Sequence, residues 1–163
     1  MKPRGFTIVE TLIYMGLLSI LMMVLTELLL SVLDVQSKTE ATSNIQQDGR
    51  FLLARLQYDI NRATALVTPA FKGTSTDSLQ LSIGGTNHVY LLSGNDLHVG
   101  TGAAAINLNG FNTSVSGLTF TRIGNTGGRE DTVRIDLTIN SRVATKSGSD
   151  SAQFTTSYAL RRN

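Results

Sequence analysis

Hydrophobic and polar positions divide the chain into three stretches with different periods. The first, residues 6–33, is almost wholly apolar, and it carries no charge between Thr11 and Thr26. As a helix, that uncharged part would be about 24 Å long, slightly shorter than a hydrocarbon core of about 30 Å. Glu27 ends it. The run therefore predicts a membrane-spanning helix that also suits a protein bundle, because a dedicated anchor would normally be longer and free of Glu27.

The second stretch, residues 34–68, changes to a one-sided apolar pattern. Its apolar or small residues recur at steps of three, four and seven, the period of an amphipathic helix: Ile45, Gly49, Leu52, Leu56, Ile60, Ala63 and Val67. We expect the polar face to hold Gln47, Arg50, Gln57, Asp59, Asn61 and Arg62. We also expect Asp48-Gly49 to mark either a kink or local melting of the helix, because Gly costs about 1 kcal/mol against Ala in a helix. The helix should end at Thr68, before Pro69, with its stripe docked on the sheet that follows.

The third stretch, residues 69–163, alternates apolar and polar positions with a period of two. The clearest alternation is Val133, Ile135, Leu137 and Ile139 against Arg134, Asp136 and Thr138. One polar side is typical of an antiparallel sheet with a face in water, and short Gly and Asn turns such as Gly84-Gly85 favour hairpins. The predicted fold class is α+β: a long N-terminal helix packed on an antiparallel β-sheet head.

The N-terminus needs its own explanation. Lys2 and Arg4 form a short basic leader that meets Gly5 and then Phe6. Glu10 stands at the head of the apolar run, where a charge costs up to about 2.5–3.5 kcal/mol at mid-bilayer. A secretory signal would carry a small-residue cleavage site after the run, but Asp-Val-Gln-Ser-Lys follows it. A plain anchor fits the positive-inside rule but leaves Glu10 and the Gly5-Phe6 junction unexplained.

Six of these first residues resemble a known processing signal: Lys2, Arg4, Gly5, Phe6, Thr7 and Glu10. At this spacing, before an apolar helix, they resemble the cleavage and methylation signal of type IV prepilins and type II secretion pseudopilins. The resemblance implies that a membrane prepilin peptidase removes residues 1–5 by cutting between Gly5 and Phe6. The same enzyme would then N-methylate Phe6. It also implies the pilin-like architecture that the hydrophobic pattern predicts.

Glu10 has two interpretations. Under the resemblance, cleavage frees the α-amine of Phe6, and Glu10 neutralises such an amine in the filament core, where an unpaired buried carboxylate is very costly. Alternatively, a carboxylate in the first helical turn favours the helix macrodipole by about 0.3–1 kcal/mol. The two roles are compatible. Glu27 is either an ion-pair partner inside a filament or the point at which the helix enters water.

Two further segments are similar to minor pilins and to the larger minor pseudopilins. One is the helical segment 47–63, and the other is the tail 154–163, which ends in Arg-Arg-Asn. Many major pilins carry a kinking proline inside the apolar helix, and this chain has none there. The resemblance therefore implies a minor subunit.

Composition narrows the function classes. The chain has 14 Lys and Arg against 12 Asp and Glu residues, and loss of Lys2 and Arg4 with the leader would leave 12 of each. Nucleic-acid binding is conceivable but unsupported, since no basic stripe with interleaved aromatics occurs. The absence of cysteine excludes disulfides, thiol nucleophiles and cysteine metal sites.

Catalysis and metal binding find little support. His88 and His98 are ten residues apart, outside the spacing of a metal-binding helix, and are expected to be surface or turn histidines. Loop carboxylates at Asp77, Asp96 and Glu130-Asp131 do not form a calcium-loop pattern. We therefore predict no catalytic residue, no metal site, no cofactor and no enzymatic activity.

The predicted function is a structural subunit of a type IV pilus or a type II secretion-like filament. Its expected partners are prepilin peptidase, other pilin or pseudopilin subunits, an inner-membrane assembly platform, and the membrane before assembly. The expected location is the cytoplasmic membrane, single-pass with the head outside, and then a surface or periplasmic filament. The alternative is a membrane-tethered extracytoplasmic β-domain binding protein that does not polymerise. The expected segments are 1–5 leader, 6–33 membrane and filament-core helix, 34–68 amphipathic helix, and 69–163 β head.

Overall fold

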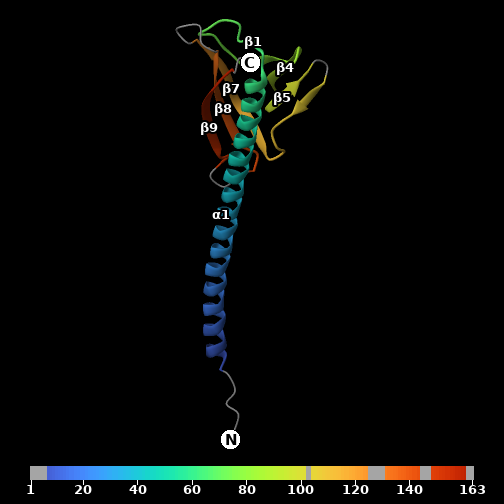
Figure 1. Cartoon of the computed structure of the whole chain (residues 1–163). Helices are drawn as coiled ribbons and strands as arrows, with labels where there is room; N and C mark the ends of the chain where they lie inside the picture. The colour runs from blue at the N-terminus through green and yellow to red at the C-terminus, as the bar shows by residue number, and fades with distance from the viewer. Residues whose placement is uncertain (1–6, 102–103, 125–130, 144–147, 161–163) are drawn as a thin grey trace.

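The computed structural model describes residues 7–101, 104–124, 131–143 and 148–160. A single helix, α1, runs from Ile8 to Arg62 without interruption, and a β head packs against one side of its C-terminal part (Figure 1). At 55 residues the helix is roughly 80 Å long. Its N-terminal part projects from the head as a bare stem. The predicted α+β, pilin-like architecture is confirmed.

The head contains two antiparallel sheets where the sequence pattern predicted one. The first has the order β1-β3-β4-β5-β6 and the second has the order β2-β7-β8-β9. The strands of the first sheet are Ala65–Thr68, Leu79–Ile83, Thr86–Ser93, Asp96–Gly100 and Ala105–Asn107. Those of the second are Ser75–Thr76, Thr113–Ile123, Thr132–Ser141 and Ser151–Ala159. The chain divides because β2 pairs with β7, far along the sequence, and not with its neighbour β3.

Tight turns set the register of the hairpins. Gly84 and Gly85 join β3 to β4 with φ values of 58° and 81°. Two consecutive positive φ angles define the turn whose twist matches that of paired strands, and glycine adopts them without strain. Ile83 consequently pairs with Thr86 across the shortest loop that a hairpin allows.

One hydrophobic core lies between α1 and the two sheets. The helix contributes the predicted stripe, and Ile45, Leu52, Leu56 and Ile60 are buried. The sheets contribute the side chains of alternate strand residues that face inward, including Leu79, Leu81, Tyr90, Leu97, Val115, Phe120, Val133, Ile135, Leu137 and Ile139. The stripe therefore docks on the head as expected.

The helix ends earlier than the pattern indicated. Arg62 is its last residue, and Ala63 already has extended backbone angles of φ −68° and ψ 133°. Thr64 N donates a hydrogen bond of 2.8 Å to Ser82 O, which starts the pairing of β1 with β3. The expected boundary at Thr68 is therefore wrong, since residues 65–68 are a strand of the head. Val67, assigned to the helical stripe, lies on the exposed side of β1.

Gly49 does not kink the helix. The Phe154 ring of β9 lies directly over it, and a Cβ built on Gly49 would be 2.4 Å from Phe154 Cζ. The helix is continuous at this position. Gly49 is thus a point of close approach between α1 and the second sheet, which a larger residue would prevent.

Asp59 does not lie on the polar face, as the pattern suggested. It is 1% exposed, accepts a hydrogen bond from the Tyr90 hydroxyl of β4, and pairs with Arg55 Nε at 3.1 Å. Burial of the phenol and this hydrogen bond raise the pKa of Tyr90 well above its ordinary value. The buried carboxylate is tolerated because both partners face it, and it attaches α1 to the first sheet.

Candidate functional site

The N-terminal end of α1 carries the candidate processing and assembly site. Gly5 and Phe6, where cleavage and methylation are expected, lie outside the described residues. Thr7 is the N-cap, with extended angles of φ −85° and ψ 152°. Its side chain accepts a hydrogen bond of 3.3 Å from Glu10 N, which satisfies one of the free amides of the first turn. The helix therefore begins after the Gly5-Phe6 bond.

Glu10 lies in the first turn and is half-buried against its own helix. The Tyr14 hydroxyl, one turn further along, donates a hydrogen bond of 3.1 Å to Glu10 Oε1. None of the ion pairs among the described residues includes Glu10. The carboxylate is therefore held in position by a neutral donor, and it can accept a cation from another part of the assembly.

The stem above Glu10 is suited to an apolar environment. Its large apolar side chains are exposed all round the helix, and it is long and apolar enough to cross a membrane. Its hydroxyls donate to carbonyls of the preceding turn, as in the bonds of Ser19 to Met15 O and Thr26 to Met22 O. Such hydroxyls bring no unsatisfied polar group into lipid or into a helix bundle.

Sequence reasoning identified Glu10 and named Thr7 in the processing signal, but it did not predict that Thr7 and Tyr14 position Glu10. Thr7 and Glu10 have the spacing of a capping box, and that signal was present in the sequence. Tyr14 lies four residues after Glu10, the spacing at which helical side chains meet. Both contacts are local, so periodicity alone could have identified them.

The head residues considered for chemistry do not assemble into a site. His88 lies in β4 and His98 in β5, both half-buried, so they lie on separate strands and not in turns. Strand alternation places His88 on the side of Tyr90 and His98 on the opposite side from Leu97. Across the described part of the chain, no group of three His, Cys, Asp or Glu side chains could hold a metal ion.

Two of the head carboxylates considered for calcium, Asp96 and Asp131, are engaged in structural contacts. Asp96 accepts hydrogen bonds from Asn109 Nδ2 at 2.8 Å and from the Arg142 guanidinium at 2.6 Å, and these hold its pKa below the ordinary value. Asp131 pairs with Arg122. Asp77 is exposed, and Glu130 lies outside the described residues.

The comparisons with known proteins bear on the N-terminus alone. Residues 1–26 match the family model described as the prokaryotic N-terminal methylation motif. Comparison of the chain with curated proteins and with solved structures found no match. The matched motif implies processing by prepilin peptidase, membrane anchoring, and assembly with other pilin subunits. The chain therefore carries a prepilin-type methylation motif at its N-terminus, ahead of a pilin-like α+β architecture.

Proposed function

We propose that the chain is a minor pilin or pseudopilin, a structural subunit that is cleaved after Gly5, N-methylated on Phe6 and added to a filament. The observation that supports this most directly is the arrangement of Glu10. It lies within the methylation motif, on an uninterrupted helix, held by Thr7 and Tyr14, with no cationic partner among the described residues.

In this proposal, Glu10 accepts the methylated α-amine of Phe6 from the same or a neighbouring subunit. Two opposite charges about 4 Å apart attract by roughly 4 kcal/mol at an effective dielectric near 20. A carboxylate left alone in the filament core would instead meet a large desolvation cost. Pairing is therefore favourable at one axial position and unfavourable at others, so Glu10 sets the register of one subunit on the next.

Before assembly, the subunit would stand in the cytoplasmic membrane with its head outside, and an inner-membrane platform would add it to a pilus or to a secretion pseudopilus. Its function in the filament is structural, with no enzymatic activity of its own. The head packs α1 through dedicated contacts and leaves the stem exposed, which suits a subunit whose stem is covered by its neighbours.

Mass spectrometry of the mature N-terminus tests the processing step. We expect a chain that begins with N-methylated Phe6, whereas an intact Met1 would favour the non-polymerising binding protein. Glu10→Gln keeps the size of the side chain and its hydrogen bond to Tyr14 but removes the charge. We expect this variant to be processed normally but incorporated at least tenfold less into sheared filaments.

Glu27→Gln is the matched control for Glu10→Gln, since it removes a carboxylate from the same stem, away from the first turn. We expect Glu27→Gln to be incorporated normally. Normal incorporation of Glu10→Gln would contradict the register role while leaving the processing proposal intact.

A further inference from the structure

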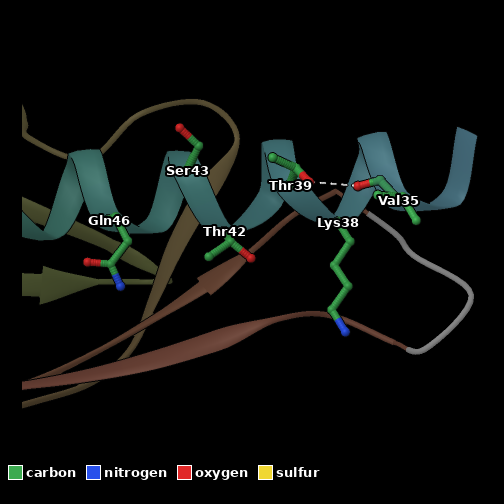
Figure 2. Close-up of a pocket in the computed structure, with 6 residues that line it drawn as sticks. All are labelled: Val35, Lys38, Thr39, Thr42, Ser43 and Gln46. Atoms are coloured by element: carbon green, nitrogen blue, oxygen red, sulfur yellow. Dashed lines mark hydrogen bonds between the residues drawn. The ribbon is translucent and has the colours of Figure 1, made fainter. Parts of the chain in front are cut away.

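A groove lies on one flank of α1, at the end of the head nearer to residue 8. Figure 2 shows Lys38, Thr42 and Gln46 extending from this flank of the helix. The Thr42 hydroxyl donates a hydrogen bond of 3.3 Å to Asp150, just before β9. The groove has a volume of about 450 Å³ and a mainly apolar surface, built from methyl and methylene groups of Val35, Lys38, Thr39, Thr42, Ser43 and Gln46. Because a cavity of about 150 Å³ is enough to hold benzene, the groove has room for an aromatic side chain.

An exposed aromatic side chain lies elsewhere on the same molecule. Phe111, in the connection between β6 and β7, is 90% exposed, more than any other large apolar side chain in the described residues. Its loop is held in place. Gly110 N donates a hydrogen bond of 2.9 Å to Asp48 Oδ2, and the Thr113 hydroxyl donates one to the same oxygen. Arg142 donates a hydrogen bond to the Phe111 carbonyl. A fixed, exposed aromatic loses little entropy on docking, as is typical of an interface anchor.

Phe111 and the groove lie on opposite flanks of the helix. Asp48, which holds the Phe111 loop, is two residues from Gln46, which lines the groove. On a helix of about 3.6 residues per turn, two residues are roughly 160° apart around the axis. One molecule therefore presents an apolar projection on one flank and an apolar groove on the other. Surfaces of this kind join copies head to tail, in an interface that does not close as a two-fold dimer does.

We propose that Phe111 of one copy docks into the groove of a second copy that stands parallel to it. The inference rests on the proposed function, because shared membrane insertion is what keeps the helices parallel. It adds the partner and the contact surface, with a second copy of this chain as the occupant. Both complementary surfaces are present on every copy, so no other protein is needed to complete the contact.

The heights of the two surfaces define the offset between the copies. Phe111 is held at the level of Asp48, and the groove is centred near residue 40. The difference is roughly 11 Å at about 1.5 Å per residue, about a third of the hydrocarbon thickness of about 30 Å. Phe71, 74% exposed, is in the connection after β1, beyond the C-terminal end of α1 and next to Ala70, whose carbonyl accepts a hydrogen bond from Arg122 near the end of β7. Docking Phe71 would require an offset of more than about 30 Å, enough to lift one stem out of the bilayer.

The offset has a consequence for assembly. Two copies at the same depth in a flat membrane cannot make the contact, because Phe111 then lies above the groove of its neighbour. The contact forms when one copy moves outward by roughly 11 Å relative to the other. It therefore belongs to the filament and not to the membrane pool. Even a subunit present in few copies must then stand beside at least one other copy.

Cysteine cross-linking of the full-length chain in its host tests this contact, because the chain has no native cysteine. Two differently tagged copies are produced together, one with Asn112→Cys, which is exposed and leaves the neighbouring Phe111 in place, and the other with Gln46→Cys, and a short bis-maleimide is added. The matched control replaces Gln46→Cys by Gln47→Cys, an exposed glutamine one residue further that does not line the groove. We expect at least tenfold more mixed dimer for the Gln46 pair than for the Gln47 pair, and only in the sheared-filament fraction.

Several results would overturn the inference. The first is equal yields with Gln46→Cys and Gln47→Cys. The second is equal yields with Phe71→Cys in place of Asn112→Cys. The third is dimers from Asn112→Cys alone, which would indicate two-fold pairing. Methylated chain in filaments without the mixed dimer, or with Asn112→Cys linked to a different subunit, would refute this contact and leave the proposed function standing. Chain with an intact Met1 and absent from filaments would refute the proposed function and this inference with it.

Discussion

Replacing Gly49 by alanine sets two effects of known sign against each other. Alanine is favoured over glycine in a helix by about 1 kcal/mol, so propensity alone would stabilise the chain. At this position, however, the new Cβ would be 2.4 to 2.8 Å from three atoms of the Phe154 ring, where ordinary contact begins at 3.4 Å. The ring or the helix must move by about 1 Å, and overpacking of this kind costs roughly 1–3 kcal/mol.

We expect the steric term to exceed the propensity term. Three ring atoms are too close at once, so rotating the ring about its own axis does not relieve the contact. Taking a cost near the upper end of the range and subtracting the propensity gain, Gly49→Ala should lower the free energy of unfolding by about 1–2 kcal/mol. Urea unfolding of the detergent-solubilised chain, followed by tyrosine fluorescence, measures this.

A double-mutant cycle isolates the contact. In a Phe154→Ala background the ring is absent, and Gly49→Ala should then stabilise the head by about 1 kcal/mol. Gly16→Ala is the control for propensity without contact, since nothing lies within 4 Å of the Cβ built there. If Gly49→Ala stabilises the chain with Phe154 present, the close approach of helix and sheet is not what requires glycine, and the reasoning fails.

Three further predictions concern the polar contacts of the head. Tyr90→Phe removes the hydroxyl that donates a hydrogen bond to buried Asp59, and it should lower the free energy of unfolding in urea by about 1–3 kcal/mol. An unchanged free energy of unfolding would mean that Arg55 alone satisfies the carboxylate. Asp48→Ala should release the loop that holds Phe111, which limited proteolysis would detect as new cleavage near Gly110; unchanged protection would contradict this. The pKa of Asp96 is lowered in the fold, so its contribution is present above about pH 4 and is lost as pH falls. The urea midpoint should therefore fall between pH 5 and pH 3, and fall less in Asp96→Asn.

The parts of the fold that followed from the sequence are those set by local periodicity. The buried faces of α1 and of β8 repeat with helical and strand periods, and burial is what selects those repeats. The N-terminal motif is also local. The match to residues 1–26 and the Thr7 cap involve neighbours in the chain, so a single sequence was enough to indicate them.

The parts that did not follow depend on partners far along the chain. Asp59 reads as a polar-face residue until Tyr90, 31 residues later, is placed against it. The end of α1 reads as Thr68 until Ser82 takes the hydrogen bond of Thr64. Gly49 reads as a weak point until Phe154 is seen to lie over it. In each case a contact with a residue far along the chain outweighs a local propensity of about 1 kcal/mol. Such a contact is not visible in any local sequence pattern.

Because α1 is continuous, an axial movement of the subunit shifts its stem and its head by the same distance. Glu10 and Asp48 belong to the same unbroken helix, roughly 57 Å apart, so an axial shift at one is an equal shift at the other. If Glu10 paired with the wrong neighbour in the stem, Phe111 would miss its groove by the same amount. The rigid helix thus couples the pairing of Glu10 in the stem to the Phe111 contact in the head. A subunit would stay in the filament only when both contacts form at the same axial offset.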